Sequence, residues 1–151
     1  MNMRSSTATA LVLALWTGAF HNAATAQEAE SDYIKKHAPP GITRTFYACV
    51  DKANTNAVAS GACLTAEHDY QDKRLNVAYK KLLNALGEKD RPSLVAAERA
   101  WLGLQDKDGV LETVIYGEDT VSSLQQDQNE VFRICERANV MERYLDIVKS
   151  K

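Results

Sequence analysis

The sequence holds little of what normally interrupts a helix. Its 151 residues include only 3 prolines and 7 glycines, the residue types that most strongly destabilise helix interiors. Strand-length segments that alternate between apolar and polar residues are absent, and no internal repeat is found. These absences exclude an all-β fold and a repeat architecture, and they favour long helices.

Residues for metal binding and catalysis are also scarce. Only 3 histidines occur, and His37 and His68 are those beyond residue 26. A zinc site needs three or four ligands, so His68 and Asp72, one helical turn apart, do not predict one. Neither a G-x-S-x-G motif nor a glycine-rich phosphate loop is present. We therefore expect no catalytic residues, no cofactor and no metal.

Excess charge is lacking as well. The net charge is −2, and no long block of one sign occurs. Nucleic-acid binding would need a basic face, which the sequence does not show. The length suits one domain with a single core.

The first 26 residues have the features of a secretory signal. Arg4 supplies a positive start, residues 8–20 are apolar, and Ala24-Thr25-Ala26 fits a cleavage site. The apolar run is shorter than the ~20 residues that cross a bilayer, so no stable membrane anchor is expected. We predict removal near Ala26, a periplasmic or secreted protein, a flexible segment over 27–43 and a helical domain over 44–151.

Two amphipathic helices are predicted between Cys63 and Asp106. Apolar or buried-type residues recur at steps of three and four: Leu64, Gln71, Leu75, Ala78, Leu82 and Leu86, then Leu94, Ala97, Trp101 and Leu104. Gly87 and Pro92 mark the end of one helix and the start of the next. We expect this pair to pack antiparallel, with the second helix reaching Ile115 and a kink near Gly109.

Two further helices complete the prediction. A short one spans about 44–52, and a long one spans about 124–148 after a loop over 116–123. The long one carries the stripe Leu124, Val131, Ile134, Ala138, Met141, Leu145 and Val148. The predicted fold class is all-α, a small bundle of three long helices plus a short N-terminal helix.

The polar residues of the central pair follow a definite order. Glu67 comes four residues after Cys63, and Asp72, Asn76 and Tyr79 match D-x-x-LN-x-x-Y; Glu98-Arg99-Ala100-Trp101 and Gln105-Asp106 follow. From Cys49 to about Arg143 the chain resembles the LprI-type lysozyme-inhibitor family, whose members show C-x-x-x-E, D-x-x-LN-x-x-Y and Q-R-x-W…RD. It departs where Glu98 replaces Gln, Gln105 replaces Arg and Gly109 replaces Cys.

All three cysteines lie in the part expected to reach an oxidising compartment, so pairing is expected. Cys49 and Cys63 are close in sequence and flank a turn-like segment, and a bridge there would contribute ~3 kcal/mol. In relatives the expected partner of Cys135 is the cysteine that Gly109 replaces. We predict a Cys49–Cys63 disulfide with Cys135 buried and reduced; an intermolecular disulfide through Cys135 is the alternative.

The resemblance implies a secreted inhibitor that binds lysozyme or another glycan-cleaving muramidase. A projecting loop could cover the enzyme's cleft, and the residues expected to contact the partner are Tyr116, Glu118, Asp119, Ser122 and Ser123. The structural alternative is that Tyr116 packs on the helices while Asp119 or Ser123 caps the last one. A periplasmic interaction or envelope-stress module without lysozyme affinity is the alternative function, and a glycan hydrolase is the least supported.

A second set of polar residues has two interpretations. Glu67, Asp72, Asn76, Arg99 and Asp106 either form a patch that grips a partner or an inter-helix network in which Arg99 bonds to Asp72 or Glu67. We favour the network, because such residues on packed helices most often set pairing.

Overall fold

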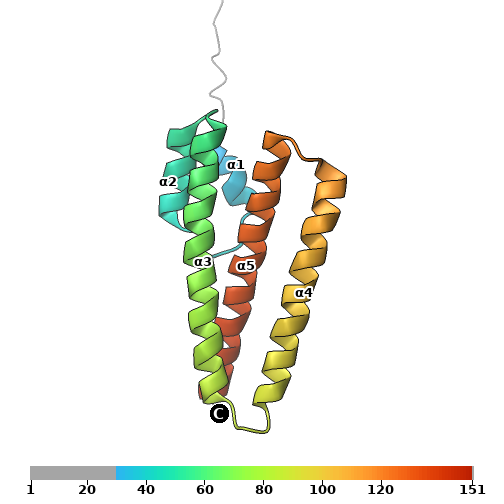
Figure 1. The fold of residues 1–151 in the computed structure, drawn as a ribbon. Helices are drawn as coiled ribbons and strands as arrows, with labels where there is room; N and C mark the ends of the chain where they lie inside the picture. Colours follow the sequence, from blue (N-terminus) through green and yellow to red (C-terminus); the bar gives the residue numbers. More distant parts are fainter. Residues whose placement is uncertain (1–29, 151) are drawn as a thin grey trace, which may run out of the picture.

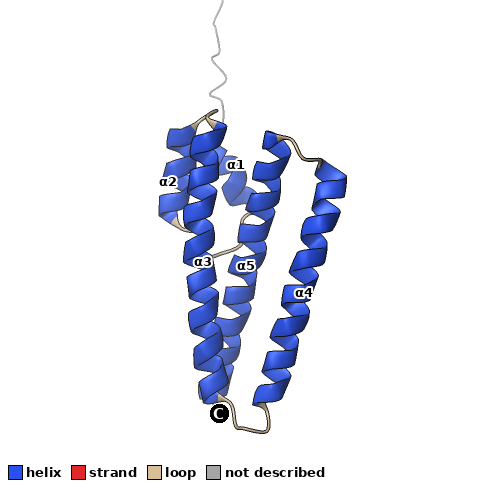
Figure 2. Ribbon diagram, viewed as in Figure 1, coloured by secondary structure: helices blue, strands red, loops and turns tan. Residues whose placement is uncertain are grey.

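The computed structural model describes residues 30–150, which form five helices (Figure 1). They are α1 (Glu30–His37), α2 (Arg44–Ala53), α3 (Ala57–Ala85), α4 (Arg91–Tyr116) and α5 (Thr120–Lys149). No strand occurs among these residues (Figure 2). The all-α class is therefore confirmed. Two short helices, and not one, precede the three long ones. The predicted signal peptide lies outside the described residues.

The centre of the molecule is the pair α3 and α5, which run side by side in the same direction (Figure 1). Both helices supply the apolar stripes that the sequence predicts. Near their N-terminal ends they form an upper core with α1 and α2. Near their C-terminal ends they form a lower core, whose buried members are Leu75, Ala78, Leu82, Leu94, Ile134, Ala138, Met141 and Leu145.

The segment over 30–43, assigned above to a flexible region, instead forms α1 and a turn that pack on the upper core. Ile34 and Ile42 are buried, and Ser31 donates from its backbone N–H and its hydroxyl to Asp51 of α2. Gly41 has φ 110°, and an added Cβ would lie 2.5 Å from Nη1 of Arg74. Isolated apolar residues among polar ones do not show periodicity, so this packing could not be predicted from the sequence.

Helix α4 does not pack along α3 as predicted. Arg91 donates to the carbonyls of Leu83 and Leu86 at the base, and Leu94 is the one buried residue of α4. Beyond that level α4 packs against α5. The reason is that α5 already covers the apolar stripe of α3. Helix α4 is also continuous through Gly109, where we expected a kink.

The cysteine prediction is confirmed. Cys49 and Cys63 form a disulfide that ties α2 to α3, and Cys135 is free and buried. The Cys135 thiol donates to the carbonyl of Pro40, and burial raises its pKa. A Cβ added at Gly109 would meet no atom within 4 Å, so position 109 does not face Cys135 in this arrangement.

Candidate functional site

Helix α4 has a small apolar contact with the lower core, through Leu94 and Trp101, and is otherwise held on α5 by charged pairs. Glu98 accepts from Nε and Nη2 of Arg137, at 3.0 and 2.8 Å. Glu112 accepts from Arg133 at 2.6 Å and from Asn129 at 3.0 Å. Among the described residues, Oε2 of Glu112 and Nε of Arg133 are buried atoms without a hydrogen-bond partner. This polar seam fixes the position of α4 while leaving most of its surface uncovered.

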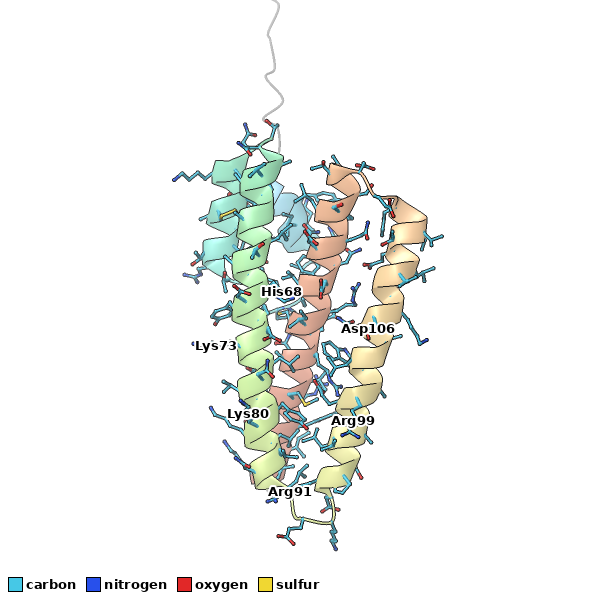
Figure 3. The ribbon with its side chains drawn as sticks, viewed as in Figure 1. His68, Lys73, Lys80, Arg91, Arg99 and Asp106 are labelled. Carbon is cyan, nitrogen blue, oxygen red and sulfur yellow. A yellow bond between two sulfur atoms is a disulfide. The ribbon has the colours of Figure 1, made fainter. Side chains whose placement is uncertain are left out.

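Because α4 leans on α5, a groove of about 560 Å³ opens between α3, α4 and α5. Residues at positions of the family pattern line it: Asp72, Asn76 and Tyr79 from α3, with Arg99 and Trp101 from α4, and also Glu98 and Gln105, which depart from the pattern. Figure 3 labels His68 on α3 and Arg99 on α4, the helices that border the groove. The motif residues thus converge in space although two helices carry them.

The predicted inter-helix network does not form as expected. Arg99 is exposed, and within residues 30–150 it has no hydrogen bond or ion pair to Asp72 or Glu67. Asn76 bonds to Asp72 one turn earlier on the same helix. Asp106 is exposed beside a separate hollow between α4 and α5. The cause is that α4 packs against α5 and not along α3, which leaves the groove between Arg99 and α3.

Glu67 is the one member of that set with a buried structural role. Its carboxylate accepts from the backbone N–H and the hydroxyl of Thr43, and from Nε2 of Gln71 at 2.7 Å. Thr43 is also the N-cap of α2, accepting from Phe46 N–H. Glu67 therefore joins the start of α2 to α3.

Sequence reasoning missed Arg74, which links α3 to α5. Its guanidinium donates to Glu142, to Asn139 at 2.6 Å and to Gln71 at 3.3 Å. The pKa of Arg74 is raised, chiefly by its hydrogen bonds to the Glu142 carboxylate. The available signal was that Asn139 and Glu142 flank the buried Ala138 and Met141 on α5.

The connection between α4 and α5 is ordered by its own side chains. Asp119 accepts from the N–H groups of Val121 and Ser122 and caps α5. The hydroxyls of Ser122 and Ser123 bond to the backbone carbonyls of Tyr116 and Asp119. The Ser122 hydroxyl and N–H lower the pKa of Asp119. The capping interpretation of Asp119 is therefore confirmed.

The same connection carries exposed apolar side chains. Val114 is 79% exposed, Val121 75% and Tyr116 46%, so Tyr116 is not packed away as the structural alternative proposed. Gly117 has φ 93° and ends α4, and its carbonyl accepts from Gln126 at 2.8 Å. We name residues 114–123 the α4–α5 tip; Glu118 is exposed within it.

Within residues 30–150, no three or more His, Cys, Asp or Glu side chains are grouped so that they could hold a metal ion. Among the same residues, no helix has the length and apolar character needed to cross a membrane.

Comparison with known proteins identifies the family. The family model described as Lysozyme inhibitor LprI matches residues 49–145, well over half of the chain. Neither a curated protein nor a solved structure matches. The matched region runs from α2 to α5 and contains both the groove and the α4–α5 tip. The chain therefore belongs to the LprI family of lysozyme inhibitors.

Proposed function

We propose that the protein is a periplasmic inhibitor that binds a lysozyme-type muramidase, and that the α4–α5 tip makes the contact. The family assignment supports lysozyme as the partner class. The observation that carries the choice of surface is the exposure of Val114, Ile115, Tyr116 and Val121 at one end of the molecule. Clustered exposed apolar side chains mark interaction sites.

The shape and rigidity of the tip suit this role. A glycosidase cleft is concave and holds two carboxylates on its walls, so a convex and ordered projection can enter it. Helix caps and the bonds of Ser122, Ser123 and Gln126 order the tip before binding. Such preorganisation lowers the entropic cost of association.

The residues of the tip have different roles in binding. Tyr116 supplies an aromatic anchor of the kind that dominates binding energy at interfaces. Glu118 and Asp119 supply negative charge toward a basic rim. Ser122 and Ser123 act by shaping the tip, because their hydroxyls already bond to its backbone.

We also propose that the protein is exported. Residues 1–26 act as a signal that is removed near Ala26, and the intact mass of the protein recovered from the periplasm tests this. A mass that still includes these residues would contradict it.

The test of the tip is a variant that keeps the α5 cap. Tyr116→Ala, Glu118→Gln and Asp119→Asn remove the anchor and both charges, while Asn remains a good N-cap residue. We expect muramidase inhibition to weaken at least ~10-fold, ~1.4 kcal/mol, with an unchanged melting temperature. Inhibition is measured as residual muramidase activity against inhibitor concentration.

Tyr144→Ala is the matched control, because Tyr144 is also 46% exposed but lies toward the other end of α5. It should inhibit like the parent. If the folded tip variant inhibits as well as the parent, the tip is not the contact surface. If the parent inhibits no muramidase, the inhibitor function itself is contradicted, and a periplasmic interaction module becomes the function to test.

A further inference from the structure

The groove between α3, α4 and α5 is a concave site that the inhibitor proposal does not use. Its volume of about 560 Å³ lies within the ~300–1,000 Å³ typical of small-molecule sites. It is separate from the α4–α5 tip, since none of residues 114–123 lines it. A ligand could therefore occupy the groove without contacting the tip.

Aromatic and apolar groups form part of the lining. Tyr79 and Trp101 are half-buried on facing helices. The guanidinium of Arg137 lies 5.6 Å from the Trp101 ring centre, and Glu98 holds that guanidinium by two hydrogen bonds. The indole is thus positioned by a fixed neighbour, and leaves apolar surface for a ligand to cover.

The polar groups of the lining have unused hydrogen-bonding capacity. Within the described residues, the side chains of Arg99 and Gln105 and the hydroxyl of Tyr79 have no hydrogen-bond partner. Asp72 accepts from Asn76 through Oδ2 alone. Donors and acceptors therefore stand together on both sides of the groove, ready for a ligand that offers both.

Charge in the groove is close to balanced. Arg99 on α4 and Asp72 on α3 carry opposite charges without forming an ion pair, and Arg137 neutralises Glu98. Glu130 lies 3.6 Å from His68, which offsets it only when protonated, so the groove has a formal excess of one negative charge at neutral pH. No excess of positive charge exists to hold a phosphate, and Arg99 disfavours a strongly cationic peptide. One excess charge is too small to select an ion, so a neutral ligand fits this lining best.

We propose that this groove binds a neutral oligosaccharide of N-acetylated amino sugars. Sugar hydroxyls both donate and accept, which suits amides, a carboxylate and a guanidinium together. The C–H face of a pyranose ring covers an aromatic face such as that of Trp101. An acetamido group adds one donor for Asp72 and one acceptor for Arg99. The site would hold the protein on a glycan, independently of the tip.

Trp101 supplies the readout. It is the one tryptophan in residues 27–151, so the fluorescence of the exported protein reports on the groove. Titration with chitotetraose, a β-1,4-linked tetramer of N-acetylglucosamine, should change this fluorescence saturably. Cellotetraose, the matched glucose tetramer without acetamido groups, should bind at least ~10-fold more weakly.

Variants locate the binding. Arg99→Met keeps the side-chain stem but removes the donors, and should weaken chitotetraose binding at least ~10-fold. Arg143→Met, at an exposed arginine of α5 outside the groove, should bind like the parent. Far-ultraviolet circular dichroism checks that both variants are folded.

Three results of the sugar titrations would overturn the proposal. They are no saturable response to chitotetraose, equal affinity for cellotetraose, and a response that Arg99→Met leaves unchanged. Preferential binding of a lysine-rich peptide at Trp101 would also overturn it, because the groove would then select positive charge. A failure of muramidase inhibition by the parent protein has no bearing on these results.

Discussion

Glu67 illustrates how one side chain of the family pattern can be structural while its neighbours are not. It is 3% exposed and holds Thr43 and Gln71 in place, whereas Asp72 and Asn76, one to two turns later, are exposed at the groove. Glu67 lies three residues after Leu64 and four before Gln71, a spacing that belongs to the buried face, although we grouped it with the polar residues of the patch or network. Its partner Thr43 could not be predicted, because the path of the chain before α2 has no periodic signal.

Replacing Glu67 by Ala should lower the free energy of unfolding by roughly 2–4 kcal/mol. The change leaves two donors of Thr43 and one of Gln71 without their acceptor, and an unsatisfied buried group costs about 1–3 kcal/mol. Urea unfolding followed by circular dichroism measures the loss. Asp69→Ala, at an exposed carboxylate of the same helix, should change stability by less than ~0.5 kcal/mol. Equal losses in both variants would show that Glu67 has no special role.

At the scale of the element, α4 is unusual for the way it is attached. A helix normally docks through an apolar stripe, but the apolar contact of α4 is limited to Leu94 and Trp101. Glu98 and Glu112, each paired with an arginine of α5, supply the other attachments. Charged pairs need specific partners, so they fix the register of α4 on α5. One departure from the family pattern is Glu98 in place of Gln. Its carboxylate forms an ion pair with Arg137, which a glutamine could not do.

The Glu112–Arg133 pair should show strong coupling in a double-mutant cycle. Each side chain is about one-fifth exposed or less, at 15% and 22%, and each keeps a buried atom without a partner. Glu112→Leu or Arg133→Met alone should cost ~2 kcal/mol, below the ~3–5 kcal/mol of fully buried pairs. The double variant should be close to the parent in stability. Additive losses in the unfolding experiment would rule out direct coupling.

Helix extents were more predictable than helix partners. Gly87 and Pro92 mark the junction of α3 and α4, and the apolar stripes mark the buried faces of α3 and α5, in agreement with the structure. Two predicted starts were wrong, because α3 begins at Ala57, ahead of Cys63, and α5 begins at Thr120, inside the predicted loop over 116–123. The apolar periodicity of α3 shows which face is buried, but it does not show whether α4 or α5 covers that face. What decided between them was the larger apolar stripe of α5, which covers α3 along both cores.

For the whole molecule, stability is divided unevenly between a compact body and α4. The body consists of α1, α2, α3 and α5, joined by two cores and the Cys49–Cys63 disulfide. Along α4 the large apolar residues are mostly exposed: Leu102, Leu104, Val110, Leu111, Val114 and Ile115. Fold class and disulfide could be predicted from sequence, whereas this division could not, because it depends on how α4 is oriented.

Hydrogen exchange should reveal the division. Amides in the middle of α4 should exchange faster than those in the middle of α3 and α5, because regions with few buried contacts open at lower free energy. Mass spectrometry of peptides covering 98–112, 70–82 and 131–145 provides the comparison. Equal protection in all three would mean that α4 opens only with the whole molecule.

The pairing of α3 with α5 has a consequence for the order in which the chain can fold. The two helices are separated in sequence by all of α4, so both cores wait for a long loop to close. Helix α5 follows the other four helices of residues 30–150 in sequence, and each of the two cores lacks buried members until α5 is present. A newly made chain therefore cannot complete either core until α5 has been synthesised. For a protein that we propose is exported, that delay keeps the chain threadable through a translocation channel until it reaches the compartment where its disulfide forms.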